Sequence, residues 1–153
     1  MLAQKIEATE ASQDFSLISK GIYVGSYKSA SVAYQFDVVV NCAKEHMIPR
    51  VPKAELLKVP LIDAPFDFQG NKNTLYQLYQ VAFYLSDKIL QGKKILFYCH
   101  KGWNRSALMA GLTMVCLGYP PKQAINLLRR RNSNVLSNQS FAEAIQYASR
   151  IGS

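Results

Sequence analysis

The feature that most constrains this chain is the stretch from Lys94 to Gly118, KILFYCHKGWNRSALMAGLTMVCLG. It begins with a short apolar run at residues 95–98, rich in β-branched and aromatic side chains, which predicts a central strand covered on both faces. Residues 105–117 are apolar almost all round, which predicts a helix buried in the middle of the domain. The stretch therefore predicts a strand, a tight polar loop and a buried helix in succession.

The polar loop, residues 99–105, has the properties of an oxyanion-binding site. A loop that enters a helix presents unpaired N–H groups at the positive end of the helix dipole, where a phosphate binds readily. Gly102 lets the backbone turn without a Cβ clash, and Arg105 offers a planar fork of donors to two phosphate oxygens. The same field stabilises a negative sulfur. Alone, Cys99 would be a small buried hydrophobe, but its fixed spacing to Gly102 and Arg105 indicates a nucleophile.

Residues 99–106, CHKGWNRS, resemble the C-x5-R-S/T active-site loop of the cysteine-dependent protein tyrosine phosphatases, particularly the small dual-specificity phosphatases. The segment ISKGIYVGS, residues 18–26, is similar to the opening hairpin of that family. The resemblance extends over nearly all of residues 15–150. It implies hydrolysis of phosphotyrosine and phosphoserine or phosphothreonine in proteins through a cysteinyl-phosphate intermediate, with no cofactor and no metal.

The resemblance also implies roles for the loop residues. Cys99 attacks phosphorus, Arg105 and the loop amides bind the phosphate oxygens, and the Ser106 hydroxyl assists release of the cysteine. Without the resemblance, Ser106 could simply bond backbone at the helix N-terminus. Likewise, Lys101 could face solvent and Trp103 could pack on the following helix. The expected phosphate-binding residues are His100, Lys101, Gly102, Trp103, Asn104 and Arg105.

The departing oxygen needs a proton donor, which a carboxylic acid on a nearby loop can supply. Asp63 directly follows the apolar run at residues 59–62, similar to where the family keeps its general acid. Asp67, in the same loop, is the alternative, and either carboxylate could instead only cap or solvate this loop. We expect Asp63 to be the acid.

Two further residues bear on the nucleophile. Cys42 ends the predicted strand at residues 36–42, and its default interpretation is a buried structural thiol. The segment at residues 41–46, NCAKEH, nevertheless resembles phosphatases in which a second cysteine approaches the nucleophile from behind. Parallel strands would then make Cys42 a redox partner of Cys99. Tyr98 stands where the family commonly has a histidine, and its hydroxyl could hold the loop instead.

The order of the segments predicts one α/β domain over residues 15–150, after a flexible N-terminal arm at residues 1–14. We expect a mixed, largely parallel sheet of about five strands flanked by helices, as in the protein tyrosine phosphatases. Strands are expected near residues 15–18, 22–24, 36–42, 56–61 and 95–98. Helices are expected at residues 27–35 and 105–117 and after caps at Asn73 or Thr74, at Pro120 and at Ser137 or Asn138.

Composition narrows the class of protein. The 153 residues are 49% hydrophobic and 18% charged, as in an ordinary globular domain. No apolar run approaches the roughly 20 residues needed to span a bilayer, and the N-terminus lacks an apolar signal core. We therefore expect an intracellular protein, cytoplasmic or nuclear. Cys42, Cys99 and Cys116 are an odd number without metal-ligand spacing, which argues against a disulfide scaffold or a zinc site.

The net charge of +8 favours anionic partners but does not choose among phosphoproteins, phosphoinositides and RNA. Asn104–Arg105 is similar to the G-x-N-R form of RNA 5′-phosphatases, and Gly102–Trp103 to the G-W-D-R of myotubularin-type phosphoinositide phosphatases. Both substrates stay open as alternatives. A non-enzymatic phosphate-binding module is disfavoured because nucleophile, arginine and acid candidate are all present. We interpret the run Arg129–Arg131 as a complement to the dipole of the helix that it ends, in preference to a dedicated binding patch for anions.

Overall fold

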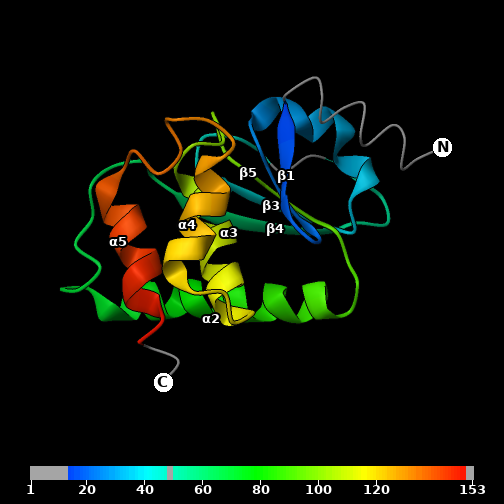
Figure 1. Cartoon of the computed structure of the whole chain (residues 1–153). Coiled ribbons are helices and arrows are strands. Elements are labelled where there is room, and N and C mark those ends of the chain that lie inside the picture. Colours follow the sequence, from blue (N-terminus) through cyan, green and yellow to red (C-terminus); the bar gives the residue numbers. More distant parts are fainter. Residues whose placement is uncertain (1–13, 48–49, 151–153) are drawn as a thin grey trace.

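Five strands form one mixed sheet in the order β1-β2-β5-β3-β4. Figure 1 shows this sheet, with β1, β5, β3 and β4 labelled. The structure is a computed structural model that describes residues 14–47 and 50–150. β1 pairs with β2 antiparallel, whereas β2, β5, β3 and β4 run parallel. The predicted fold class is therefore confirmed. The strands are β1 (Phe15–Ser19), β2 (Ile22–Gly25), β3 (Val38–Ala43), β4 (Glu55–Leu61) and β5 (Ile95–Tyr98).

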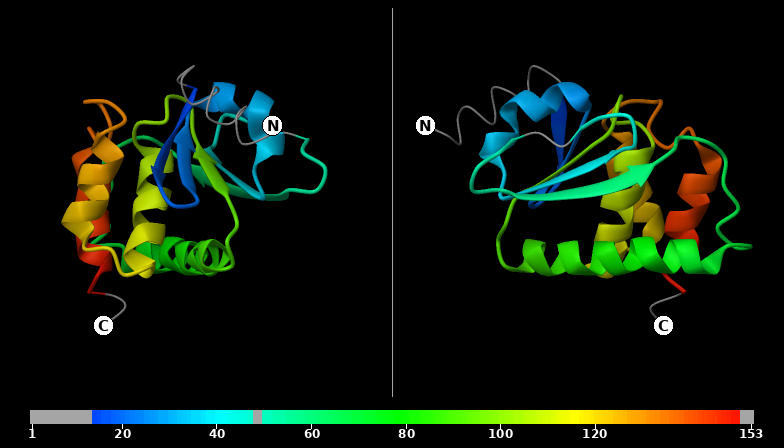
Figure 2. Two further views of the ribbon diagram at one scale, coloured as in Figure 1. Left: turned by 45° about the vertical axis from the view of Figure 1, so that its right-hand side comes forward. Right: turned by 180° about the vertical axis from the view of Figure 1, so that it is seen from behind.

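Helices cover both faces of the sheet, and Figure 2 shows the α-helices gathered on one side. That face packs against α2 to α5, and the other face packs against the 3-10 helix η1. The buried helix predicted after the polar loop is α3, in which every residue from 105 to 114 is buried. The helical elements are η1 (Tyr27–Gln35), α2 (Lys72–Leu90), α3 (Arg105–Cys116), α4 (Pro121–Arg129) and α5 (Gln139–Ala148).

Side chains of the central strand β5 alternate between the two cores. Ile95 and Phe97 join the cluster beneath α2 to α5, whereas Leu96 and Tyr98 join the cluster beneath η1. Successive side chains of a strand point to opposite faces, so both faces of β5 are apolar and buried. This explains why its sequence reads as one continuous apolar run.

Element ends differ slightly from the predictions. α2 begins at Lys72 after Asn71, a little earlier than the predicted caps, and α5 begins after Asn138 as one predicted option had it. Of the predicted arm, residues 1–13 lie outside the described residues. Within residues 14–47 and 50–150, no helix is both long and apolar enough to cross a bilayer.

The four parallel strands end at the same edge of the sheet, because parallel strands share one direction. The segments that follow them therefore meet there. These segments begin with Ser26 after β2, Lys44 after β3, Ile62 after β4 and Cys99 after β5. The edge gathers the candidate nucleophile, arginine and acid from distant parts of the chain.

Candidate active site

Cys99 lies at the floor of the loop between β5 and α3, with only 2% of its surface exposed. The backbone N–H of Gly102 donates to its Sγ at 3.3 Å, and Ser106 Oγ lies 3.2 Å from the same sulfur. Hydrogen-bond donors that face a sulfur stabilise its thiolate form. The local fold thus places two polar groups, the Gly102 N–H and the Ser106 hydroxyl, against the Cys99 sulfur.

Gly102 allows this loop to pack directly on the end of β2. Its φ of +77° is one that L side chains rarely adopt, and an added Cβ would lie 2.7 Å from the carbonyl oxygen of Gly25. The same carbonyl accepts the N–H of Cys99 at 3.3 Å. The tight turn therefore requires glycine.

Arg105 is 7% exposed and is fixed at one edge of its guanidinium. Its Nη1 and Nη2 donate to the Glu45 carboxylate at 2.6 and 2.8 Å, and Nη1 also donates to the Leu61 carbonyl at 3.1 Å. This bidentate pair raises the pKa of Arg105 and lowers the pKa of Glu45 to about 2. Arg105 Nε, in contrast, is buried and has no hydrogen-bond partner among the described residues.

The two candidate acids lie in different environments. Asp63 is turned toward the loop of Cys99: Oδ2 accepts from Asn104 Nδ2 and Oδ1 from Asn138 Nδ2, each at 3.0 Å. Asp67 Oδ1 instead accepts the N–H of Gly70 at 3.0 Å, within its own turn. Only Asp63 is therefore linked by hydrogen bonds to the residues before Arg105.

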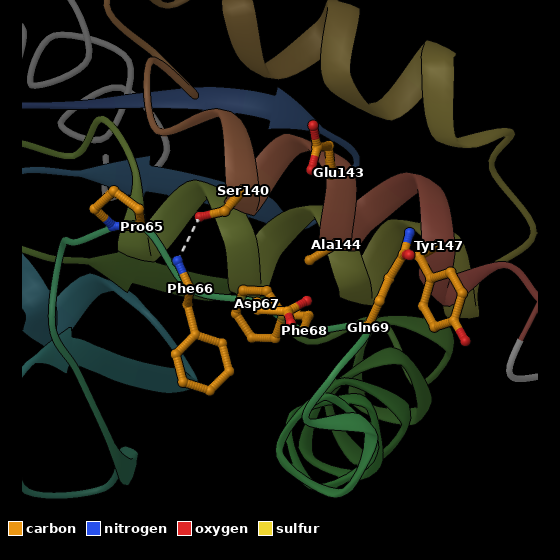
Figure 3. Close-up of a pocket in the computed structure, with 9 residues that line it drawn as sticks. All are labelled: Pro65, Phe66, Asp67, Phe68, Gln69, Ser140, Glu143, Ala144 and Tyr147. Carbon is orange, nitrogen blue, oxygen red and sulfur yellow. Dashed lines mark hydrogen bonds between the residues drawn. The ribbon is translucent and has the colours of Figure 1, made fainter.

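A hollow of about 460 Å³ lies between the loop after β4 and α5. Figure 3 shows the residues that line it. Asp67 lines it, and the N–H of Phe66 donates to Ser140 Oγ there at 3.1 Å. Asp63 lines a separate hollow of about 470 Å³, together with Asn104 and others. The two acids thus face different depressions of the surface, and the one in Figure 3 does not include the residues around Cys99.

The Asn104 side chain connects the Cys99 loop to its surroundings, because its hydrogen-bonding groups all face protein. Besides Asp63, its Nδ2 donates to Ser137 Oγ at 3.2 Å, and its Oδ1 accepts the N–H of Asn138 at 2.9 Å. It is buried. The side chain therefore joins three segments that are distant in the sequence.

The other predicted phosphate-binding side chains form the rim of the loop. His100 is half-buried, and its Nδ1 lies 2.9 Å from Nε2 of His46. Lys101 is exposed, with Nζ 5.7 Å from the ring centre of the half-buried Trp103. The Trp103 carbonyl accepts the N–H of Leu136 at 2.8 Å. These contacts place the three side chains around the loop, whereas Gly102 and Arg105 lie within it.

Comparison with known protein families identifies the family of this chain. The family model described as "Dual specificity phosphatase, catalytic domain" matches residues 22–150, which is most of the chain. The chain belongs to the dual-specificity phosphatase family. It is thus a cysteine-dependent phosphatase of the protein tyrosine phosphatase superfamily, as the resemblance of residues 99–106 predicts. A search of curated proteins gave no significant match.

Solved structures share the fold of this phosphatase. Human DUSP28 is 19% identical with a TM-score of 0.77, covering 90% of this chain and 94% of that one. A mouse putative dual specificity phosphatase complexed with zinc tungstate is 20% identical with a TM-score of 0.77, at 91% and 88% coverage. The human tyrosine phosphatase-like serine/threonine/tyrosine-interacting protein is 19% identical with a TM-score of 0.72, at 92% and 98%. At these identities the likeness establishes the fold alone.

Tyr98 precedes the nucleophile of this phosphatase and is almost fully buried. Its hydroxyl donates to the Met47 carbonyl at 3.3 Å, so it bonds the segment after β3 and does not bond the Cys99 loop itself. Burial, together with the nearby Cys42, raises the pKa of Tyr98 to about 12. The residue thus ties the end of β5 to the neighbouring segment.

Cys42 lies on the same face of the sheet as Cys99. The register pairs Val40 with Phe97 and Asn41 with Tyr98, which makes Cys42 and Cys99 the next neighbours on adjacent strands. Both belong to the core under α2 to α5. Burial chiefly, and then the charge of Cys99, raises the pKa of the Cys42 thiol well above its ordinary value. The sheet therefore brings the two sulfur-bearing residues together.

Sequence reasoning assigned no role to Glu45 and misplaced Arg131. The Arg131 side chain turns away from the end of α4: its Nη1 donates to Ser16 Oγ at 2.8 Å. Its Nη2 lies beside Gly102, where an added Cβ would be only 3.0 Å from it. Its charge interacts with that of Cys99, although burial chiefly lowers its pKa. Only Arg129 bonds nearby carbonyls, those of Val135 and Leu136. A run of arginines does not reveal which of them turns inward.

Proposed function

We propose that this phosphatase hydrolyses phosphate monoesters of phosphoproteins through a cysteinyl-phosphate intermediate. The Cys99 thiolate attacks phosphorus, and Arg105 with the loop N–H groups binds the equatorial oxygens. The transition state carries its charge on those oxygens, so fixed donors around them lower the barrier. The loop geometry supplies these donors before substrate arrives.

The observation that carries the proposal is the unpartnered Nε of Arg105. A buried donor without a partner typically costs about 1–3 kcal/mol, so such a group points to an acceptor from outside the chain. Glu45 occupies the end of the guanidinium, while Nε and Nη2 form its other edge. A phosphate oxygen pair fits that second edge, and Glu45 can keep Arg105 in place throughout.

Asp63 protonates the leaving oxygen in this proposal. Its contacts with Asn104 and Asn138 support the role, since they direct the carboxyl group toward the loop of Cys99. Asp67 is engaged by its own turn. Ser106 Oγ, 3.2 Å from the sulfur, would donate to Cys99 as water hydrolyses the intermediate.

We infer that both phosphotyrosine and phosphoserine or phosphothreonine enter this site. The loop that carries Asp63 is short, and its residues 62–67 are all exposed. These residues therefore do not form the wall of a deep pocket that would exclude the shorter phosphoserine and phosphothreonine. RNA and phosphoinositides are the weaker alternatives. Their resemblance depended on Asn104–Arg105 and Gly102–Trp103, and the Asn104 side chain already donates to Asp63 and Ser137.

The test is a panel of phosphotyrosine, phosphoserine and phosphothreonine peptides, capless RNA and phosphoinositides, assayed with wild type and Cys99→Ser. Cys99→Ser should lose turnover on every substrate but still bind tungstate or phosphopeptide, because Arg105 and the loop amides remain. Cys116→Ser, at a partly buried thiol at the end of α3, is the matched control and should stay active. Substantial hydrolysis by Cys99→Ser would refute the mechanism, and a preference for RNA or lipid would refute the substrate class.

A further inference from the structure

The only two histidines in the sequence meet in the fold. His46 follows β3 and His100 follows β5, and His46 Nε2 lies 2.9 Å from His100 Nδ1 although 54 positions separate them. One carboxylate oxygen of Glu45 completes the group. The three ligand atoms all lie within 4.8 Å of one another. Two imidazoles and a carboxylate are a donor set suited to zinc and related transition metals.

The two rings are oriented by the surrounding protein. They are nearly coplanar, with an 8° angle between them, and both stack on Tyr27 at centroid distances of 4.8 and 5.0 Å. Their backbones are fixed as well: the His46 carbonyl accepts from Asn41 Nδ2 at 2.7 Å, and the His100 carbonyl accepts from Tyr27 N at 3.2 Å. The donor nitrogens are therefore positioned without any metal, which reduces the entropy lost when a metal binds.

A metal ion can take the place of the single proton between the rings. The contact requires one N–H and one lone pair, and that proton can move to the other nitrogen of its own ring. Zn–N bonds of about 2.0–2.1 Å place two tetrahedral nitrogens about 3.3 Å apart. The N···N distance then grows by only a few tenths of an ångström from 2.9 Å. Each ring must also turn by about 35°, so that its lone pair points at the metal and not at the other ring. The Glu45 carboxylate can shift toward the metal while it stays paired with Arg105, since half of its side chain is exposed.

We propose that Glu45, His46 and His100 form a binding site for Zn²⁺ beside the phosphate loop. Each Glu45 oxygen accepts from Arg105 and retains lone pairs for a metal. The nearby charges of Arg105 and of Lys58, which donates to the His46 carbonyl, weaken the attraction but do not occupy the ring nitrogens. The site shares Glu45 with the Arg105 ion pair and His100 with the Cys99 loop, so it adjoins the phosphate site. Its two ring nitrogens have no role in the proposed phosphoryl transfer.

The test uses full-length, tag-free protein carrying Cys99→Ser, so that turnover and the reactive thiol play no part. Co²⁺ serves as the spectroscopic probe and Zn²⁺ as its competitor. We expect one Co²⁺ per chain, with absorption of nitrogen and oxygen ligation and no thiolate band. His46→Gln should weaken binding by more than about 100-fold, beyond the loss caused by removing a supporting partner. Glu143→Gln, an exposed carboxylate on α5, is the matched control and should bind as before.

A second measurement needs no variant in the site. Because the sequence holds two histidines, Zn²⁺ should shift both sets of imidazole NMR signals together in the Cys99→Ser protein. Three results would each overturn the site. The first is that the imidazole signals do not move, and the second is that binding survives both His46→Gln and His100→Gln. The third is a thiolate band that vanishes with Cys42→Ser. None of these outcomes affects the proposed hydrolysis, which Cys99→Ser tests separately.

Discussion

The loop at residues 99–105 and the loop at residues 62–67 leave the same edge of the sheet, but the chain holds them differently. Cys99, Asn104 and Arg105 are buried, and Gly102 packs on the backbone of β2. Every residue from 62 to 67 is exposed, and polar contacts from Asn104, Asn138 and Ser140 hold that loop. The binding half of the proposed site is thus part of the core, and the proton-donating half depends on a few surface hydrogen bonds.

This difference suits the two tasks. Donors that stabilise a phosphoryl group must be fixed before the reaction, which a buried loop at a helix N-terminus achieves. An acid must meet leaving groups of different size, which an exposed loop permits. We therefore expect changes in the buried loop to affect every substrate, and changes in the exposed loop to affect mainly substrates with poor leaving groups.

The largest effect should come from Arg105→Lys in the buried loop. Arginines that stabilise a transferring phosphoryl group are worth roughly 10³–10⁵ in rate, and a lysine cannot bind phosphate with one edge and Glu45 with the other. We expect kcat/KM to fall by about that factor for all substrates, with weaker tungstate binding. Arg130→Lys, in the turn after α4, is the control. A near-normal Arg105→Lys enzyme would contradict the assignment of the phosphate site.

Asp63→Asn in the exposed loop should slow phosphopeptide hydrolysis by roughly 10²–10⁴. Substrates with very good leaving groups, such as aryl phosphates of acidic phenols, should be spared because they need no proton. Asp67→Asn is the matched control, since its carboxylate caps its own turn. The same pattern in Asp67→Asn instead of Asp63→Asn would transfer the acid role to Asp67.

A smaller effect is expected from Cys42→Ser, at the thiol beside Cys99 beneath the buried loop. Adjacent strands lie about 4.8 Å apart, within the roughly 7 Å Cα limit for a disulfide. Peroxide would oxidise the Cys99 thiolate to a sulfenic acid, and the Cys42 thiol would then displace water to form the disulfide. We expect thiol reductant to restore most activity of oxidised wild type but little of Cys42→Ser.

Mass spectrometry should show a Cys42–Cys99 peptide in the oxidised wild type. Cys116→Ser should recover as wild type does. The redox role would be excluded if Cys42→Ser also recovered fully, or if the cross-linked peptide were missing while activity still returned.

The smallest effect concerns Tyr98, at the junction between the buried loop and the segment after β3. Its folded-state pKa is raised from an ordinary value of 10.0 to about 12, so unfolding becomes easier as pH rises from about 10 toward 12. Tyr98→Phe removes that contribution and should show a flatter fall of Tm over this range. Tyr34→Phe, at an exposed site, is the control. Parallel Tm curves for wild type and Tyr98→Phe would contradict the burial effect.

Much of this protein follows from the sequence alone. The apolar run before Cys99 and the apolar helix after Arg105 require burial, and a short loop between a strand and a helix has few conformations. For this reason the strand, the helix and the tight loop between them were predictable, as were the largely parallel sheet and the family. Helical spacing predicts an apolar face on α2 made of Leu75, Leu78, Ala82, Leu85 and Ile89. The first four are buried and Ile89 is half-buried.

Contacts between distant segments were decided by the tertiary structure. Nothing in local spacing indicates that Glu45 pairs with Arg105, that Arg131 turns toward Gly102, or that His46 meets His100. Such contacts arise because parallel strands bring their carboxyl ends to one edge, and the order β2-β5-β3-β4 differs from the order in the chain. Local sequence specifies each strand and its loop, whereas the neighbours of each loop depend on strand order, which long-range packing sets.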